Sequence, residues 1–244
     1  PRRRDRDLLR PELRAAHAHA HGLDRAVDHV QPECFDTGAR LDRELCLVRQ
    51  AAGMDIFAPV GSMVVDIGGG TTDTAVISYG GIAANDSIRT GGRHIDGAIA
   101  DYIAAQYGVR IGEKTAEEIK LSLGAALIGG MERRQFKGRS LKTGLPECVA
   151  LTGGEVSHAI APTVRRIVDS VRRTLSETPP ELAADLIDTG IVLTGGGAKL
   201  RGLDKLISHE TGLKVSIAED PMYCVALGAL KLGSGEDIDA PRYA

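Results

Sequence analysis

Three apolar segments with strand character stand near the middle of the chain. Residues 62–67, 73–79 and 81–89 are rich in Val, Ile and Ala and are separated by glycine-rich connections. Short β-branched runs bounded by glycines are typical of strands, and the Gly80-Gly81 dipeptide is typical of a tight hairpin turn. These segments therefore predict a three-stranded antiparallel meander.

Helical periodicity dominates the segments that follow. Residues 90–108 and 154–177 both place apolar side chains three to four positions apart, which gathers them on one face of a helix. Another helix is predicted to open at Thr115, where Glu118 completes a capping box. The apolar faces are formed by Ile95, Ile99 and Ile103 in the first helix, and by Val156, Ile160, Val164, Ile167, Val171 and Leu175 in the long one.

Strands and helices also alternate through the rest of the chain. Residues 126–152 have β character, 181–188 predict a short helix, and 190–212 predict a strand, a glycine loop and a helix. "LKVSIA" then predicts a strand and "YCVALGALKL" a last helix. Mixed strands and helices in this order predict an α/β layered domain.

Composition separates the first 52 residues from the others. Residues 1–52 are rich in Arg and His, contain no lysine and show no apolar periodicity, so we expect them to be poorly ordered. The folded region is expected at 53–232, followed by a C-terminal tail at 233–244. A formal net charge of −3 argues against a nucleic-acid partner, and only 3% aromatic residues predict an aliphatic core.

Two glycine loops directly follow predicted strands. "VVDIGGGTT" occupies 64–72 and "IVLTGGGAKLRGL" occupies 191–203. Glycines let backbone N–H groups approach an anion with no Cβ in the way, and we expect the second loop to open a helix whose N-terminus favours phosphate. Tight turns that use glycine only for packing are the alternative, which the repetition of the arrangement disfavours.

Polar residues beside these loops have the chemistry of a nucleotide site. Asp66 can hold a hydrated Mg²⁺, and Thr71 and Thr72 can donate hydroxyls to phosphate oxygens or to an attacking water. Glu117 and Lys120, three apart on a predicted helix, belong either to this site or only to a solvated ion pair. The cysteines lack metal or redox spacing, and we interpret them as free thiols.

Several longer motifs resemble the MreB/Mbl family of bacterial actin homologues. They include "GSMVVDIGGGTTDTAVISYGGI", "IGEKTAEEIK", "TPPELAADLIDTGIVLTGGGAKLRGLD" and "AEDPMYCVALGALK", and the resemblance covers about 53–232. It implies an α/β actin-like ATPase fold of the ribonuclease H-like type, incomplete because most of the first lobe, with its first phosphate loop, has no counterpart. Residues 1–52 do not match, and we interpret them as the product of a frameshifted or truncated gene.

The resemblance also implies a role for each motif residue. Asp66 would position Mg²⁺, Thr71 would orient the hydrolytic water, and Glu117 and Lys120 would contact the adenosine of ATP. The residues expected to contact phosphate or line the nucleotide cleft are Gly68, Gly69, Gly70, Thr72, Gly195, Gly196 and Gly197.

The function that the resemblance implies is that of a cytoplasmic, ATP-binding cytoskeletal protein. It would polymerise into filaments that guide cell-wall synthesis and set cell shape. The implied partners are further copies of itself or MreB protomers, and morphogenetic membrane proteins, which would provide its membrane association because no amphipathic anchor is recognisable.

Two alternatives accompany this interpretation. Since the first phosphate loop has no counterpart, we expect weak ATP binding and poor hydrolysis, and the chain could then act only as a non-hydrolysing interaction module. A sugar kinase or an Hsp70-type chaperone of the same superfamily is disfavoured, because the sequence shows no sugar-binding insertion and no substrate-binding β-domain.

Overall fold

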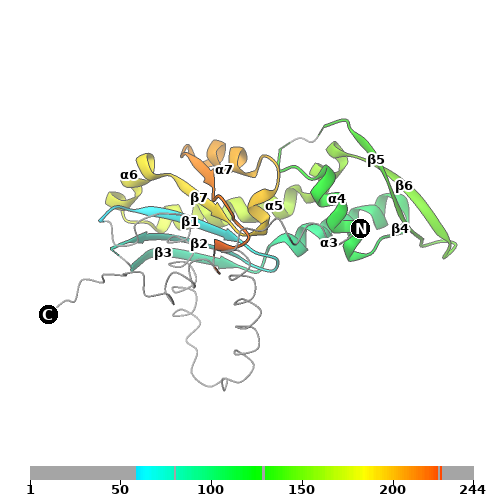
Figure 1. Ribbon diagram of the computed structural model, residues 1–244, viewed down its shortest axis with the longest axis horizontal. Helices are drawn as coiled ribbons and strands as arrows, with labels where there is room; N and C mark the ends of the chain where they lie inside the picture. Colours follow the sequence, from blue (N-terminus) through cyan, green and yellow to red (C-terminus); the bar gives the residue numbers. More distant parts are fainter. Residues whose placement is uncertain (1–58, 80, 128–129, 225, 227–244) are drawn as a thin grey trace, which may run out of the picture.

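The structure is a computed structural model that describes residues 59–79, 81–127, 130–224 and 226 (Figure 1). The predictions made for residues 1–52, for the tail at 233–244 and for most of the last helix lie outside this part. The described chain forms a five-stranded mixed sheet, a three-stranded antiparallel sheet, and helices that pack against both.

The larger sheet contains the predicted meander. β1 (Ser62–Ile67), β2 (Thr72–Ser78) and β3 (Gly81–Ile88) pair antiparallel in that order, so the three predicted strands are confirmed to within one residue. Met63 on one face of β1 belongs to the main core, and Val64 on the other face is equally buried in a smaller cluster. An uninterrupted apolar run is what a strand buried on both faces requires.

Two parallel strands extend the sheet on the other side of β1. β7 (Ile191–Thr194) pairs with β1, and β8 (Val215–Ile217) pairs with β7, which gives the order β3-β2-β1-β7-β8. Parallel neighbours must be joined by a crossover, and here the smaller sheet and the helices lie between β1 and β7 in the chain. The carboxyl ends of β1 and β7 therefore lie at the same edge.

Two helices follow the meander. α3 (Gly92–Tyr107) buries the predicted isoleucine stripe. α4 (Glu113–Leu123) begins two residues before the predicted start at Thr115, with Gly112 as its N-cap and no side-chain cap hydrogen bond. The predicted capping box is therefore wrong, because a glycine in extended conformation already starts this helix.

Two strands of the smaller sheet lie in the segment 126–152 predicted to have β character, and its short first strand was not predicted. β4 (Val109–Arg110), β5 (Arg133–Ser140) and β6 (Pro146–Thr152) pair antiparallel in that order. Phe136 on β5 and Val149 on β6 face each other across the pair and join the main core. This sheet lies beyond α3 and α4, away from the five-stranded sheet (Figure 1).

The longest helix, α5 (Gly153–Glu177), connects the two sheets. Its predicted apolar stripe is confirmed, with five residues fully buried and Leu175 partly buried. The helix starts with a capping box that the sequence analysis missed, in which Thr152 and Glu155 each satisfy the other's backbone N–H. α6 (Pro180–Thr189) and α7 (Leu203–Thr211) lie on the same side of the large sheet as α5 (Figure 1).

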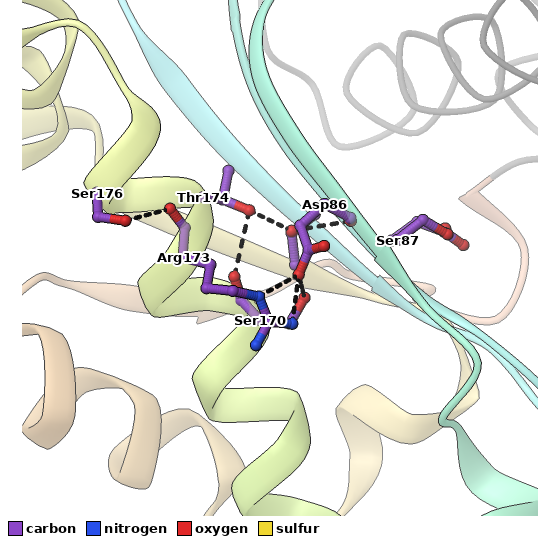
Figure 2. Close-up of polar contacts among 8 residues, drawn as sticks. Asp86, Ser87, Ser170, Arg173, Thr174 and Ser176 are labelled. Atoms are coloured by element: carbon purple, nitrogen blue, oxygen red, sulfur yellow. Dashed lines mark hydrogen bonds and ion pairs between the residues drawn. The ribbon is translucent and has the colours of Figure 1, made fainter.

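A polar network attaches α5 to the meander (Figure 2). The carboxylate of Asp86 on β3 accepts hydrogen bonds from Ser170 at 2.7 Å and from Arg173 at 2.6 Å. Beneath it, the hydroxyl of Thr74 lies 2.6 Å from the hydroxyl of Thr174 and donates to the backbone carbonyl of Asp86. Both threonines are fully buried, so these hydroxyls can be satisfied only by each other and by backbone carbonyls.

The buried hydroxyl pair predicts a specific pattern of stability changes. Thr74→Val should lower the free energy of unfolding by about 1–3 kcal/mol, because the fully buried hydroxyl of Thr174 loses one partner and keeps only the carbonyl of Ser170. Adding Thr174→Val should cost less than the sum of the two single changes, since the double variant has no buried hydroxyl that lacks its hydroxyl partner. Urea unfolding of the four proteins measures this coupling, and strictly additive losses would contradict it.

The α5 capping box predicts a pH-dependent contribution to stability. Hydrogen bonds from the hydroxyls of Thr152 and Tyr107 lower the pKa of Glu155 below its ordinary value of 4.5. A lowered pKa means that the charged carboxylate stabilises the fold above pH 4.5, and that this stability is lost as the pH falls through the folded-state pKa. Glu155→Gln should therefore destabilise at pH 7 and much less at pH 3.

The control for this pH prediction is Tyr107→Phe, which removes the other partner of the same carboxylate. The hydrogen bond to Glu155 raises the pKa of Tyr107 to about 12. The stabilising contribution of this hydrogen bond is therefore complete below pH 10 and is lost as the pH rises towards 12. Urea unfolding midpoints of the two variants, measured from pH 3 to pH 7 and from pH 10 to pH 12, test the roles of Glu155 and Tyr107. A destabilisation by Glu155→Gln that stays constant from pH 7 to pH 3 would contradict the role of the charged carboxylate.

Candidate functional site

The two glycine loops predicted from the sequence lie next to each other. β1 and β7 are parallel neighbours, and Asp66, near the end of β1, is in register with Thr194, the last residue of β7. Residues 68–71 and 195–197 continue from these strand ends. Loops that leave adjacent parallel strands at their carboxyl ends form the usual position of a ligand site in open α/β sheets.

Close packing against β1 explains two glycines of the second loop. Gly195 has a φ of +76°, and a Cβ there would lie 2.4 Å from the carbonyl oxygen of Ile67 and 2.5 Å from Oδ1 of Asp66. A Cβ on Gly197 would lie 2.2 Å from Cγ2 of Ile67. Both positions therefore exclude any side chain, and the two loops approach each other more closely than other residues would allow.

The first loop is held by the N-terminus of α3. The N–H groups of Gly92 and Arg93 donate to the carbonyls of Gly68 and Gly69 at 2.9 and 2.8 Å. Within the loop, the N–H of Gly68 donates to the carbonyl of Thr71 at 2.9 Å. The first turn of this helix is thus bonded to protein carbonyls, and the loop has a fixed position against it.

A cavity of about 580 Å³ opens between these loops and α4. This volume lies in the range of small-molecule sites, which is about 300–1,000 Å³. Eight of the predicted site residues line the cavity: Asp66, Gly68, Gly69, Glu117, Lys120, Gly195, Gly196 and Gly197. The structure therefore brings together, from three separate segments, most of the residues that the sequence singled out.

Three predicted residues do not line this cavity: Gly70, Thr71 and Thr72. Thr72 is fully buried, and its hydroxyl donates to the carbonyl of Thr90 at 2.7 Å. It is the first residue of β2 and faces the core with Thr74, so its predicted ligand contact is corrected by the structure. Thr71 is exposed outside the cavity lining.

The second loop leads into a helix, as predicted. Gly196–Lys199 form one turn of 3₁₀ helix, labelled η2, and α7 starts at Leu203 after Gly202, which has a φ of +75°. The predicted order of strand, glycine loop and helix over 190–212 is therefore confirmed, with η2 lying between the three glycines and α7.

Asp66 is the candidate metal ligand of the cavity. Its Oδ1 accepts a hydrogen bond from the hydroxyl of the buried Thr194 at 3.1 Å. The thiol of Cys224 is buried, and this burial, together with the negative charges of Asp66 and Asp220, raises the pKa of Cys224 to about 11. No group of three potential metal ligands occurs among the described residues, so a cation bound here would take its other oxygens from a ligand or from water.

The α4 wall differs from the predicted ion pair. Nζ of Lys120 lies 2.9 Å from Oδ2 of Asp96 on α3 and donates to the carbonyl of Gly92 at 3.3 Å. Lys120 therefore links α4 to α3, and the solvated Glu117–Lys120 pair considered as the alternative does not form. The side chains of Lys120 and Asp96 are mostly buried, with exposures of 16% and 15%.

Several residues that line the cavity were not predicted from the sequence. Arg93 stands beside the first loop and Lys199 in η2, and both line the cavity. Leu121 and Met222 add exposed apolar surface at its rim, with exposures of 71% and 59%. A cation directly after the Gly91-Gly92 pair was a visible signal for Arg93, whereas no local pattern indicates the other three.

Comparison with known sequences gives consistent matches. The MreB/Mbl protein family matches residues 25–239, which begins upstream of the motifs quoted above. The chain is 45% identical over 189 residues to the cell shape-determining protein Mbl of Bacillus cereus, covering 77% of this chain and 57% of that one. It is 45% identical over 196 residues to the cell shape-determining protein MreB of Escherichia coli, covering 78% and 56%. The chain thus spans somewhat more than half the length of these relatives.

Solved structures agree with this assignment. MreB5 of Spiroplasma citri bound to AMPPNP is similar with a TM-score of 0.76 and 36% identity, covering 79% of this chain and 58% of that one. A MamK double helical filament matches with a TM-score of 0.66 at 20% identity, covering 96% and 78%, which shows a shared fold. The α/β actin-like fold expected from the sequence is therefore confirmed, and the chain belongs to the MreB/Mbl family.

Proposed function

We propose that this chain binds ATP with Mg²⁺ in the cavity between its two glycine loops. The proposal rests on one observation: both loops, Asp66 and the α4 residues line the same cavity of about 580 Å³. Two similar structures support it, because MreB5 of Spiroplasma citri is described bound to AMPPNP and bound to ADP.

The residues present fit such a ligand in chemistry as well as in volume. The glycine loops can take the phosphates, and Asp66 supplies one carboxylate to a cation that phosphate oxygens and water would complete. Glu117 and Lys120 stand on the α4 wall, where contact with adenosine is proposed. The exposed apolar surface of Leu121 and Met222 suits the flat face of a base.

We further propose an actin-like cytoskeletal role in cell-shape determination. The relatives are named cell shape-determining proteins, and the MamK structure is described as a filament. Self-association into filaments is the proposed form of action, with MreB protomers and morphogenetic membrane proteins as further partners. Among the described residues, no helix is both long and apolar enough to cross a membrane.

Calorimetric titration of the purified chain with Mg·ATP tests the nucleotide site. Saturable binding is expected, and Asp66→Ala should weaken it by about 10- to 100-fold, as loss of support for a bound metal does elsewhere. Asp101→Ala, which removes an exposed carboxylate on α3 that does not line the cavity, should bind like the wild type. Equal affinities for all three proteins would refute the site, and no binding by a folded wild type would refute the function.

Sedimentation of the chain at high speed tests filament formation. If the assembled form binds ATP more tightly than the free subunit, Mg·ATP must shift the protein towards the pellet. The wild type should therefore pellet more with Mg·ATP than without, and Asp66→Ala should show no such response. A protein that stays in the supernatant with and without nucleotide, but binds MreB subunits, would instead support the interaction module.

A further inference from the structure

Arg93 is a cationic residue of the cavity to which the family motifs assign no role. It is the second residue of α3, it is exposed, and it lines the cavity beside Gly68 and Gly69. Its guanidinium forms no ion pair and no side-chain hydrogen bond with any residue in the described part of the chain. A positive charge thus stands at the first glycine loop without a protein partner there.

The other cations of the cavity close to α4 are already engaged. Lys120 is paired with Asp96 at 2.9 Å. The guanidinium of Arg201 donates to the backbone carbonyls of Gly124 at 3.0 Å and of Ser122 at 3.1 Å. These two side chains therefore hold the walls together, and their donors have carbonyl or carboxylate partners before any ligand arrives.

The backbone donors at the start of α3 are engaged as well. A helix N-terminus commonly binds an anion through its first N–H groups. Here the N–H groups of Gly92 and Arg93 donate to the carbonyls of the first loop, so this route to an anion is closed. A phosphate near this loop must be met by other donors, and the guanidinium of Arg93 offers several in a planar fork.

Gly70 leaves room for this guanidinium. A Cβ at Gly70 would lie 2.8 Å from Nη2 of Arg93, and a Cβ at Gly69 would lie 3.7 Å from Nε. The side chain of Arg93 therefore lies across the loop, and a side chain at position 70 would displace its guanidinium.

We infer that Arg93 is an anion-binding residue that holds the phosphate end of the nucleotide against the first glycine loop, and that Gly70 is a positioning residue for it. The inference rests on the proposed nucleotide function and adds to it a residue and a direction for the ligand. Charge-assisted hydrogen bonds from a guanidinium to phosphate oxygens are directional, so the contact selects for phosphate rather than for the nucleoside.

Calorimetry with Mg·ATP and with adenosine tests the role of Arg93. Arg93→Ala should weaken binding of Mg·ATP by about 10- to 100-fold, as expected for loss of hydrogen bonds to a charged group, and leave adenosine binding unchanged. Arg93→Lys should give an intermediate affinity, because it keeps the charge and loses the fork. Arg89→Ala, a matched loss of an exposed arginine outside the cavity lining, should bind both ligands like the wild type.

A double-mutant cycle tests the role of Gly70. Gly70→Ala should weaken Mg·ATP binding by displacing the guanidinium, and it should add no further loss in the Arg93→Ala background. Additive losses would show that Gly70 acts on the ligand directly and would overturn its positioning role.

Three outcomes for Arg93 are distinguishable. Wild-type affinity of Arg93→Ala for Mg·ATP, or an equal loss for adenosine, would overturn the inference and leave the nucleotide site intact. Failure of the folded wild type to bind Mg·ATP would overturn the proposed function and this inference together. Thermal melting of each variant shows that the proteins compared are folded.

Discussion

The parallel pairing of β1 with β7 is the contact on which the rest of the structure depends. It joins strands far apart in the sequence and places Asp66 in register with Thr194. The pairing reaches the strand ends only because Gly195 and Gly197 carry no side chain where the backbone and side chain of Ile67 approach. Both loops thus share one edge of the sheet, and the cavity follows from that geometry.

Packing behind the sheet keeps this edge in place. α5 covers β2 and β3 with an apolar stripe, and the network around Asp86 fixes the helix in register with the strands. Apolar contact alone is tolerant of small sliding movements, whereas paired hydroxyls such as Thr74 and Thr174 require one position. The core supplies most of the stability, and the buried polar groups supply the register.

Local patterns predicted most elements, because the uninterrupted apolar run around Val64 and the period-3.6 apolar stripe that contains Ile99 are both visible in the sequence. The loops were also predictable, since glycine runs at strand ends have few other uses. Contacts between distant segments were not predictable. Lys120 binds Asp96, which lies 24 residues earlier in the chain, and no spacing pattern in the sequence indicates this contact. Thr72 was misassigned because it looks like the last loop residue but is the first buried position of β2.

Hydrogen bonds join neighbouring walls of the cavity. The first loop bonds to α3, Asp96 of α3 bonds to Lys120 of α4, the end of α4 bonds to Arg201, and Thr194 bonds to Asp66. Walls joined in this way are preorganised, because the conformational entropy of arranging them is lost when the chain folds and not when a ligand arrives. A molecule that fits would therefore bind to a receptor that has little left to rearrange.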